Sequence, residues 1–187
     1  MLSREKERIG DLIRPFAVLA GKLGLKPNHI TLLALVSGFI SAYLIFRGSY
    51  IYGAFFLALS GMLDVFDGTL ARIVGMKTEF GGILDSVMDR YVDIAVLIAL
   101  GLAGESWVAV TLALSGSLMV SYTRARAEIV IESCAVGIAE RAERIIILVA
   151  GIVLSQVYLA LILIAFLSHT TAIHRVIYSY RTLKKNN

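Results

Sequence analysis

Long apolar stretches separated by short polar joints dominate this sequence. Six of them follow one another, and each is close to the 17–25 residues that a membrane-spanning helix needs. They cover residues 30–46, 50–73, 81–103, 106–128, 138–154 and 157–180. The joints after the first, third and fifth stretches are short, so neighbouring helices run antiparallel. The pattern predicts an all-α fold, an integral membrane six-helix bundle that forms a single domain over residues 1–187.

The segment before the first stretch has a different pattern. Residues 2–24 begin charged and become apolar, with Leu12, Ile13, Phe16 and Leu19 at helical spacing. A helix of this kind lies in the membrane interface and does not cross it. We therefore expect an N-terminal interfacial amphipathic helix to precede the bundle. The first ten residues lack the apolar core and cleavage site of a signal peptide, so we expect them to be retained.

Composition supports membrane insertion. Of the 187 residues, 58% are hydrophobic and the mean hydropathy is +0.80, more apolar sequence than a soluble domain of this size needs for its core. The only cysteine, Cys134, excludes an intramolecular disulfide and a cysteine-based metal cluster, and we expect it to pack in the interior. The net charge of +4 suits an anionic leaflet, and no nucleic-acid partner is expected.

The distribution of basic residues predicts the topology. Of 18 lysines and arginines, only Arg47 falls in a joint after the first, third or fifth stretch. Cytoplasmic loops carry the excess of Lys and Arg. The chain is therefore predicted to be a multi-pass protein of the cell membrane with both termini on the cytoplasmic side.

Four aspartates interrupt the apolar pattern around the second joint. Asp64 and Asp67 are three residues apart and Asp85 and Asp89 are four apart, so each pair shares one helix face. Both pairs lie roughly 5–15 Å from the cytoplasmic helix ends, at about 1.5 Å per residue, and can meet across a helical hairpin. Carboxylates gathered in a membrane need a positive partner. Their hard oxygen atoms favour Mg²⁺ or Mn²⁺, and with so few histidines and no nearby cysteine zinc is not expected.

Small residues and one arginine accompany the aspartates. Gly68 and Ala71 share the face of Asp64, and their small side chains leave room for a flat group beside the backbone. Arg72 supplies a cation suited to phosphate. For the glycines alone, without the aspartates, close helix packing is the simpler explanation.

These residues form a spaced motif, which we call the aspartate signature. It reads Asp64-x2-Asp67-Gly68-x2-Ala71-Arg72-x8-Gly81-x3-Asp85-x3-Asp89. The motif resembles, without a departure, the signature of the CDP-alcohol phosphatidyltransferases. The six helices and the interfacial N-terminal helix resemble that family too. The resemblance implies transfer of a phosphatidyl-type group from a CDP-lipid to an alcohol with release of CMP, two bound Mg²⁺ or Mn²⁺ ions, and a homodimer.

The resemblance also implies roles for individual residues. Asp64, Asp67, Asp85 and Asp89 would ligate metal, and Asp89 would also be the catalytic base on the acceptor hydroxyl. The residues expected to bind the CDP-lipid are Asn28, Thr31, Asp64, Asp67, Gly68, Ala71, Arg72, Thr78, Gly81 and Asp85. Asp93, one turn beyond Asp89, lies outside the signature, and it could simply orient a neighbour.

Five arginines at the cytoplasmic ends of the last three stretches bear on the acceptor. They are Arg124, Arg126, Arg141, Arg144 and Arg175. Any one of them could be a topological anchor, but as a set they favour an acceptor that carries a phosphate. Arg124, Arg126, Arg144 and Arg175 resemble the inositol phosphate-binding positions of the family branch that condenses CDP-archaeol or CDP-diacylglycerol with inositol 1-phosphate.

Two alternatives stay open. Glycerol 3-phosphate carries a similar phosphate and is the main rival acceptor. A cation transporter could also hold intramembrane carboxylates. Against transport, the four aspartates of the signature lie toward one side, and no acidic relay or repeated half continues through the later helices.

Overall fold

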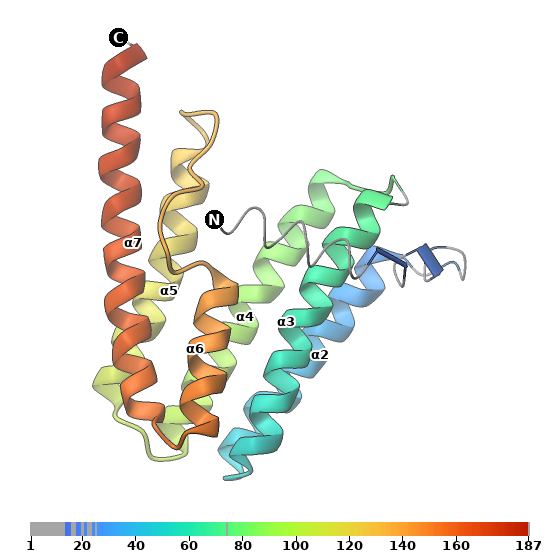
Figure 1. Cartoon of the computed structure of the whole chain (residues 1–187), viewed down its shortest axis with the longest axis vertical. Helices are drawn as coiled ribbons and strands as arrows, with labels where there is room; N and C mark the ends of the chain where they lie inside the picture. The colour runs from blue at the N-terminus through green and yellow to red at the C-terminus, as the bar shows by residue number, and fades with distance from the viewer. Residues whose placement is uncertain are drawn as a thin grey trace.

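Six helices make up the described part of the computed structural model (Figure 1). That part comprises residues 14, 15, 18, 19, 21, 24, 26–73 and 75–186. The helices are α2 (Pro27–Phe46), α3 (Tyr50–Ile73), α4 (Glu79–Leu102), α5 (Trp107–Ala127), α6 (Arg141–Val153) and α7 (Val157–Asn186). No strand occurs among these residues. The all-α bundle is confirmed, whereas the interfacial helix predicted over residues 2–24 falls mostly outside the described residues.

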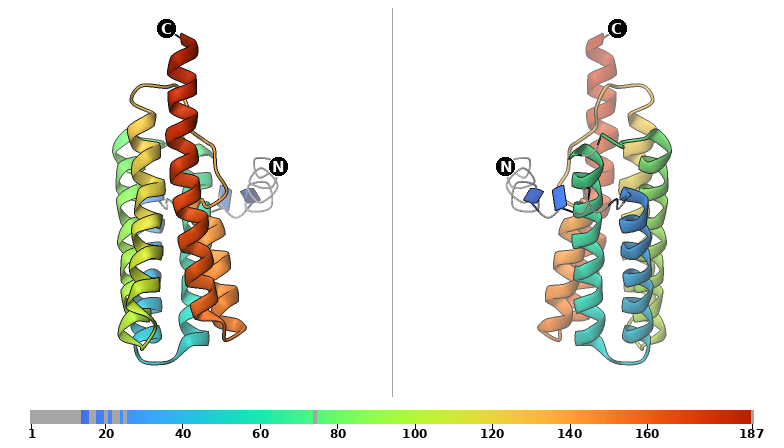
Figure 2. Two further views of the ribbon diagram at one scale, coloured as in Figure 1. Left: turned by 90° about the vertical axis from the view of Figure 1, so that its left-hand side faces the viewer. Right: turned by 90° about the vertical axis from the view of Figure 1, so that its right-hand side faces the viewer.

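Consecutive helices run antiparallel. Short turns join α2 to α3, α4 to α5 and α6 to α7, and all three turns lie at one end of the bundle (Figure 1). The α3–α4 and α5–α6 connections lie toward the other end, and α7 extends beyond the other helices there (Figure 2). Gly48 and Gly104 have φ values of +78° and +109° in two of the short turns, a backbone conformation that glycine adopts without a Cβ penalty.

Helix α2 packs between α3 and α4 through small and hydroxyl-bearing residues. The hydroxyls of Ser41 and Ser60 donate hydrogen bonds of 2.7 Å and 2.8 Å to backbone carbonyls across the α2–α3 interface. A Cβ on Gly38 would lie 2.5 Å from the Val92 side chain, so this glycine lets α2 approach α4. Such small contacts are typical of helices packed inside a membrane.

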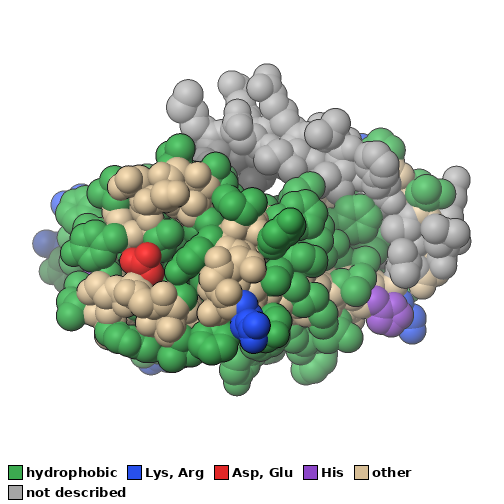
Figure 3. Space-filling model, turned by 90° about the horizontal axis from the view of Figure 1, so that it is seen from below, with side chains coloured by type: hydrophobic (Ala, Val, Ile, Leu, Met, Phe, Trp, Pro, Cys, Tyr) green, Lys and Arg blue, Asp and Glu red, His purple; other side chains and the backbone are tan. Residues whose placement is uncertain are grey.

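The outer faces of the helices are apolar. Phe55, Met62, Val108 and Phe166 are among the many large hydrophobic side chains that are more than half exposed. Three helices, α2, α3 and α7, are long and apolar enough to cross a membrane. Viewed from the end with the short turns, the surface is mostly hydrophobic, with only isolated charged side chains (Figure 3). These features identify a membrane protein whose outer faces meet lipid.

Helix α6 is shorter than the predicted stretch of residues 138–154. It has 13 residues, begins at Arg141 and is about 20 Å long, less than the thickness of a bilayer core. Before it, the backbone N–H groups of Ile138 and Ala139 donate to the Thr171 hydroxyl at 3.3 Å and 3.2 Å. These bonds hold the approach to α6 extended against α7, so the helix starts late.

The apolar core and the polar site occupy different ends of the bundle. The largest buried cluster includes Leu57, Val96, Leu100, Leu148 and Leu161, all toward the short turns. Cys134 is fully buried in a separate small cluster on the α5–α6 connection, which confirms its packing role. The charged side chains of the signature lie toward the opposite end.

Candidate active site

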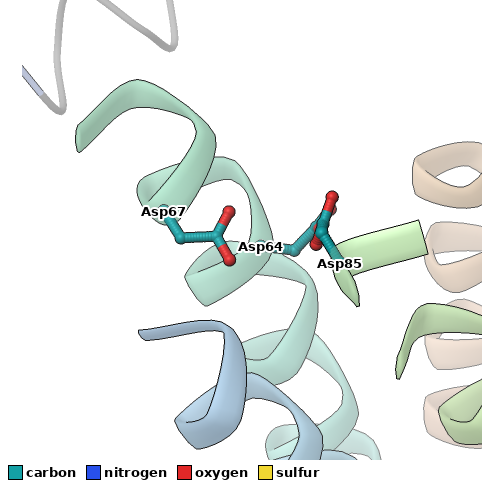
Figure 4. Close-up of side chains that lie close together, drawn as sticks. All are labelled: Asp64, Asp67 and Asp85. Atoms are coloured by element: carbon teal, nitrogen blue, oxygen red, sulfur yellow. The ribbon is translucent and has the colours of Figure 1, made fainter. Parts of the chain in front are cut away.

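Three aspartates of the signature converge. Asp64 and Asp67 come from α3 and Asp85 from α4, and their side chains lie close together (Figure 4). One carboxylate oxygen from each lies within 4.8 Å of the others, a spacing that could hold a metal ion. The cluster is buried or half-buried. Unrelated, solvated helix caps would not converge in this way.

The hairpin of α3 and α4 creates this convergence. The helices are antiparallel and joined by a short connection, so Asp67 near the end of α3 and Asp85 near the start of α4 lie at similar depth. A third helix supports the cluster: the Thr31 hydroxyl of α2 donates a hydrogen bond of 2.5 Å to Asp67 Oδ2. Thr31 lies in the first turns of α2, because Lys26 is the N-cap of this helix and Pro27 is its first residue.

A cavity of about 890 Å³ adjoins the aspartate cluster. All ten residues predicted to bind the CDP-lipid line it. They are Asn28, Thr31, Asp64, Asp67, Gly68, Ala71, Arg72, Thr78, Gly81 and Asp85. Arg14 and Lys77 also line the cavity, and sequence reasoning missed both. Lys77 could have been predicted from the sequence, because it is the only basic residue between Arg72 and Gly81 of the signature.

The glycines of the signature differ in their surroundings. A Cβ on Gly68 would meet no atom of the described residues within 4 Å, so Gly68 leaves free space and does not serve to pack two described helices together. A Cβ on Gly81 would lie 2.9 Å from Thr78 Oγ1 and 3.6 Å from Asn28 Oδ1. Thr78 is the N-cap of α4, and its hydroxyl accepts from the Gly81 N–H at 3.0 Å. Gly81 therefore brings the α4 N-terminus close to α2 at the rim of the cavity.

Asp89 lies apart from the three-aspartate cluster, in contact with an arginine. Arg141 Nη1 is 2.8 Å from Asp89 Oδ1 and 3.3 Å from Asp64 Oδ2, and its Nε is 3.6 Å from Asp93 Oδ1. Arg141 was expected among the acceptor arginines, but its guanidinium lies among the acidic side chains. Tertiary packing explains this position, because α6 packs against α3 and places Arg141, the first residue of α6, beside the signature.

Three of the other four arginines surround the start of α6. Arg144 donates 2.7 Å and 2.8 Å hydrogen bonds to Asp93 Oδ2 and to the Ala139 carbonyl. Arg175, 2% exposed, donates to the carbonyls of Val120 and Val136. Arg124 Nη1 and Arg175 Nη2 lie 3.7 Å and 3.8 Å from Glu140 Oε1.

Arg126 differs from the other arginines. It is exposed at the end of α5 and forms no ion pair with another described residue. The fold thus gathers Arg124, Arg144 and Arg175 around one segment and leaves Arg126 at its edge.

Sequence comparison identifies the fold family. Residues 25–174, most of the chain, match the CDP-alcohol phosphatidyltransferase family. The chain belongs to this family. It is 40% identical over 191 residues to an archaetidylinositol phosphate synthase of Methanothermobacter thermautotrophicus, covering 98% of this chain and 96% of the relative. It is 36% identical over 178 residues to the Pyrococcus horikoshii protein of the same name, covering 94% and 95%.

Solved structures of one family member share the fold. The crystal structure of Mycobacterium tuberculosis phosphatidylinositol phosphate synthase with CDP-DAG bound has a TM-score of 0.81 and 28% identity, covering 91% of this chain and 94% of that one. The same protein in complex with manganese and citrate gives a TM-score of 0.80 and 29% identity, covering 90% and 88%. This chain is therefore a membrane enzyme of the CDP-alcohol phosphatidyltransferase family.

Proposed function

We propose that this enzyme transfers the phosphatidyl-type group of a CDP-lipid, CDP-archaeol or CDP-diacylglycerol, to inositol 1-phosphate and releases CMP. One observation carries the proposal. The aspartate signature opens on the 890 Å³ cavity, while Asp89 meets α6, where the acceptor arginines gather. In this proposal, a donor site and a phosphate-binding site flank Asp89 as the catalytic carboxylate. The names of the similar synthases agree with this assignment.

The donor side would bind the diphosphate through metal. Asp64, Asp67 and Asp85 offer the hard oxygen ligands that Mg²⁺ and Mn²⁺ prefer, and their spacing suits an ion between them. Asp89 would contribute to a second ion. Two such ions, when bound, neutralise the diphosphate and stabilise the charge on the departing phosphate. Asn28, Gly68, Arg72 and Thr78 would hold the cytidine and phosphate groups.

The chemistry is one phosphoryl substitution. The acceptor hydroxyl oxygen attacks the phosphorus that carries the lipid, and the bond from that phosphorus to the CMP oxygen breaks. CMP leaves with the electron pair, and the hydroxyl proton passes to the Asp89 carboxylate, which acts as general base. The ion pair with Arg141 holds this carboxylate in place, because its Oδ1 is only 2.8 Å from the guanidinium.

The acceptor side selects a phosphate. Arg124, Arg126, Arg144 and Arg175 would bind the phosphate of inositol 1-phosphate, for which the planar guanidinium offers paired donors. Three of these arginines, Arg124, Arg144 and Arg175, already lie around the start of α6. A neutral alcohol would offer these guanidinium groups no phosphate oxygens for their paired donors.

A radiolabelled transfer assay tests the function. Purified protein and CDP-lipid are offered inositol 1-phosphate, glycerol 3-phosphate, inositol and serine separately, with CMP release followed in parallel. We expect efficient transfer to inositol 1-phosphate alone. Equal use of inositol and its phosphate would end the acceptor assignment and spare the transferase, whereas cation flux without CMP release would favour a transporter.

The membrane arrangement is part of the same proposal. The interfacial helix over residues 2–24 would lie along the cytoplasmic surface, both termini and the active site would face the cytoplasm, and the enzyme would be a homodimer. The buried Cys134 allows single-cysteine labelling in a Cys134→Ser background. A cysteine at Ser49 should react only from outside the cell and one at Lys185 only from inside. Cross-linking in membranes should report the dimer.

A further inference from the structure

Asp93 belongs to neither the signature nor the predicted acceptor set, yet it lies between them. It is on α4, one turn beyond Asp89, and its side chain is 12% exposed. Its two carboxylate oxygens contact different arginines. Oδ2 accepts a hydrogen bond from Arg144 Nη2 at 2.7 Å, and Oδ1 lies 3.6 Å from Nε of Arg141, the arginine that contacts the signature. Asp93 thus contacts both Arg144 of the predicted acceptor site and Arg141 beside the metal-binding carboxylates.

The contacts fix Arg144 at both ends of its guanidinium. Nη2 donates to Asp93 and Nη1 donates to the Ala139 carbonyl at 2.8 Å, so the plane of the guanidinium is determined. A guanidinium has five N–H donors, and these two bonds leave others for a ligand. The Arg144 side chain is 7% exposed, so its orientation is set by these partners and not by solvent.

Stabilisation of the fold alone is a weak explanation of the Asp93–Arg144 ion pair. A buried ion pair loses the hydration of both charges, and apolar residues of similar size often stabilise a fold as well or better. Buried polar networks instead hold groups in one orientation. The neighbouring Arg141 lies 2.8 Å from Asp89, so the same network reaches the catalytic base.

We infer that Asp93 is a positioning residue for the acceptor: it holds Arg144 in the orientation that receives the acceptor phosphate and braces Arg141 against Asp89. This inference rests on the proposed function, since it concerns the same acceptor site. Asp93 touches neither substrate. It links phosphate recognition on α6 to the base on α4.

The test compares Asp93→Asn with wild type and with Glu105→Gln, a matched neutralisation in the α4–α5 turn at the other end of the bundle. We expect Asp93→Asn to raise the KM for inositol 1-phosphate by about 10-fold or more, as loss of a charge-assisted bond predicts. The KM for CDP-lipid, the Kd for Mn²⁺ and the melting temperature should stay close to wild type. Glu105→Gln should change none of these.

A double-mutant cycle identifies the path of the effect. If Asp93 acts through Arg144, the combined Asp93→Asn and Arg144→Lys variant should raise the KM less than the product of the two single effects. Additive effects, or an Asp93→Asn variant with a normal acceptor KM, would overturn the inference. A variant that loses stability and activity toward both substrates equally would also overturn it, because that marks a purely structural pair.

The two proposals fail differently. If wild type uses glycerol 3-phosphate in place of inositol 1-phosphate, the proposed acceptor is wrong, and the same cycle with glycerol 3-phosphate still decides the role of Asp93. If wild type uses only unphosphorylated alcohols, both proposals are wrong.

Discussion

Arg141 and Asp89 form a close ion pair between α6 and α4, with 2.8 Å between Nη1 and Oδ1. The same nitrogen is 3.3 Å from Asp64 Oδ2, so one guanidinium contacts both helices of the signature. Its position makes Arg141 a neighbour of the metal-binding carboxylates and distinguishes it from the arginines farther along the acceptor site. The contrast gives the first prediction.

Replacing Arg141 by Gln should strengthen metal binding and weaken turnover. Removing a cation that adjoins Asp64 and Asp89 removes its repulsion of a divalent ion, worth at least about 1 kcal/mol at 4 Å, or about 5-fold in Kd. Turnover should fall because Asp89 loses its partner. Mn²⁺ titration followed by electron paramagnetic resonance measures the Kd. An unchanged Kd for Mn²⁺ together with a raised KM for the acceptor would indicate that Arg141 binds the acceptor, as the sequence analysis predicted.

Chelation should abolish activity, and single Asp→Asn changes at Asp64, Asp67 and Asp85 should nearly do so. Each change removes one anionic ligand from a cluster whose oxygens lie within 4.8 Å. Loss of a residue that only hydrogen-bonds to a metal ligand lowers metal affinity by roughly 10- to 100-fold. Loss of a direct ligand should lower it further. Transfer assays across a Mg²⁺ series measure the effect. Full activity in excess EDTA would contradict a metal-dependent mechanism.

Asp89→Asn should separate donor binding from chemistry. The amide keeps the size of the side chain but cannot take a proton from the acceptor. Turnover should fall by roughly 10²-fold or more, the contribution of a general base, while the affinity for CDP-lipid changes little. Single-turnover transfer and equilibrium binding of CDP-lipid measure the two quantities. Near-normal turnover would remove Asp89 from this role.

The acceptor arginines should affect one substrate only. Ala at Arg124, Arg144 or Arg175 removes a charge-assisted bond worth roughly 1.5–3 kcal/mol, so the acceptor KM should rise about 10- to 150-fold. Lys should rescue partly, since it restores the charge without the planar fork. Arg47→Ala, in the α2–α3 turn at the opposite end, is the control. If these arginines only anchor the topology, their replacement by Ala would lower membrane insertion and leave the acceptor KM unchanged.

Two glycines of the signature should respond differently to Ala. At Gly68 the added methyl group meets open space, so the protein should fold normally and only the KM for CDP-lipid should rise. At Gly81 it would approach Thr78 Oγ1 to 2.9 Å, so the α4 N-cap should shift and the melting temperature should fall too. Thermal unfolding in detergent beside donor kinetics separates the two. A destabilised Gly68→Ala protein would indicate that Gly68 packs against a partner.

Local periodicity determined much of this protein. Apolar stretches of membrane-spanning length fix the helices, and the three- and four-residue spacings of the aspartates fix their faces on α3 and α4. Because a short connection joins these two helices, the meeting of Asp64, Asp67 and Asp85 follows from the sequence. Eight of the ten predicted donor-site residues belong to this hairpin and line one cavity for the same reason, whereas Asn28 and Thr31 reach the cavity from α2.

Tertiary packing decided what periodicity cannot express. Arg141 and Arg144 are three residues apart on one helix, yet their guanidinium groups share only Asp93 as a partner. Arg141 also meets Asp89 and Asp64, whereas Arg144 also meets the Ala139 carbonyl. Those partners depend on where α6 begins, which Thr171 of α7 sets by binding the preceding backbone. Spacing along a chain specifies which side chains share a face, whereas the depth and rotation of one helix against another specify which charges meet.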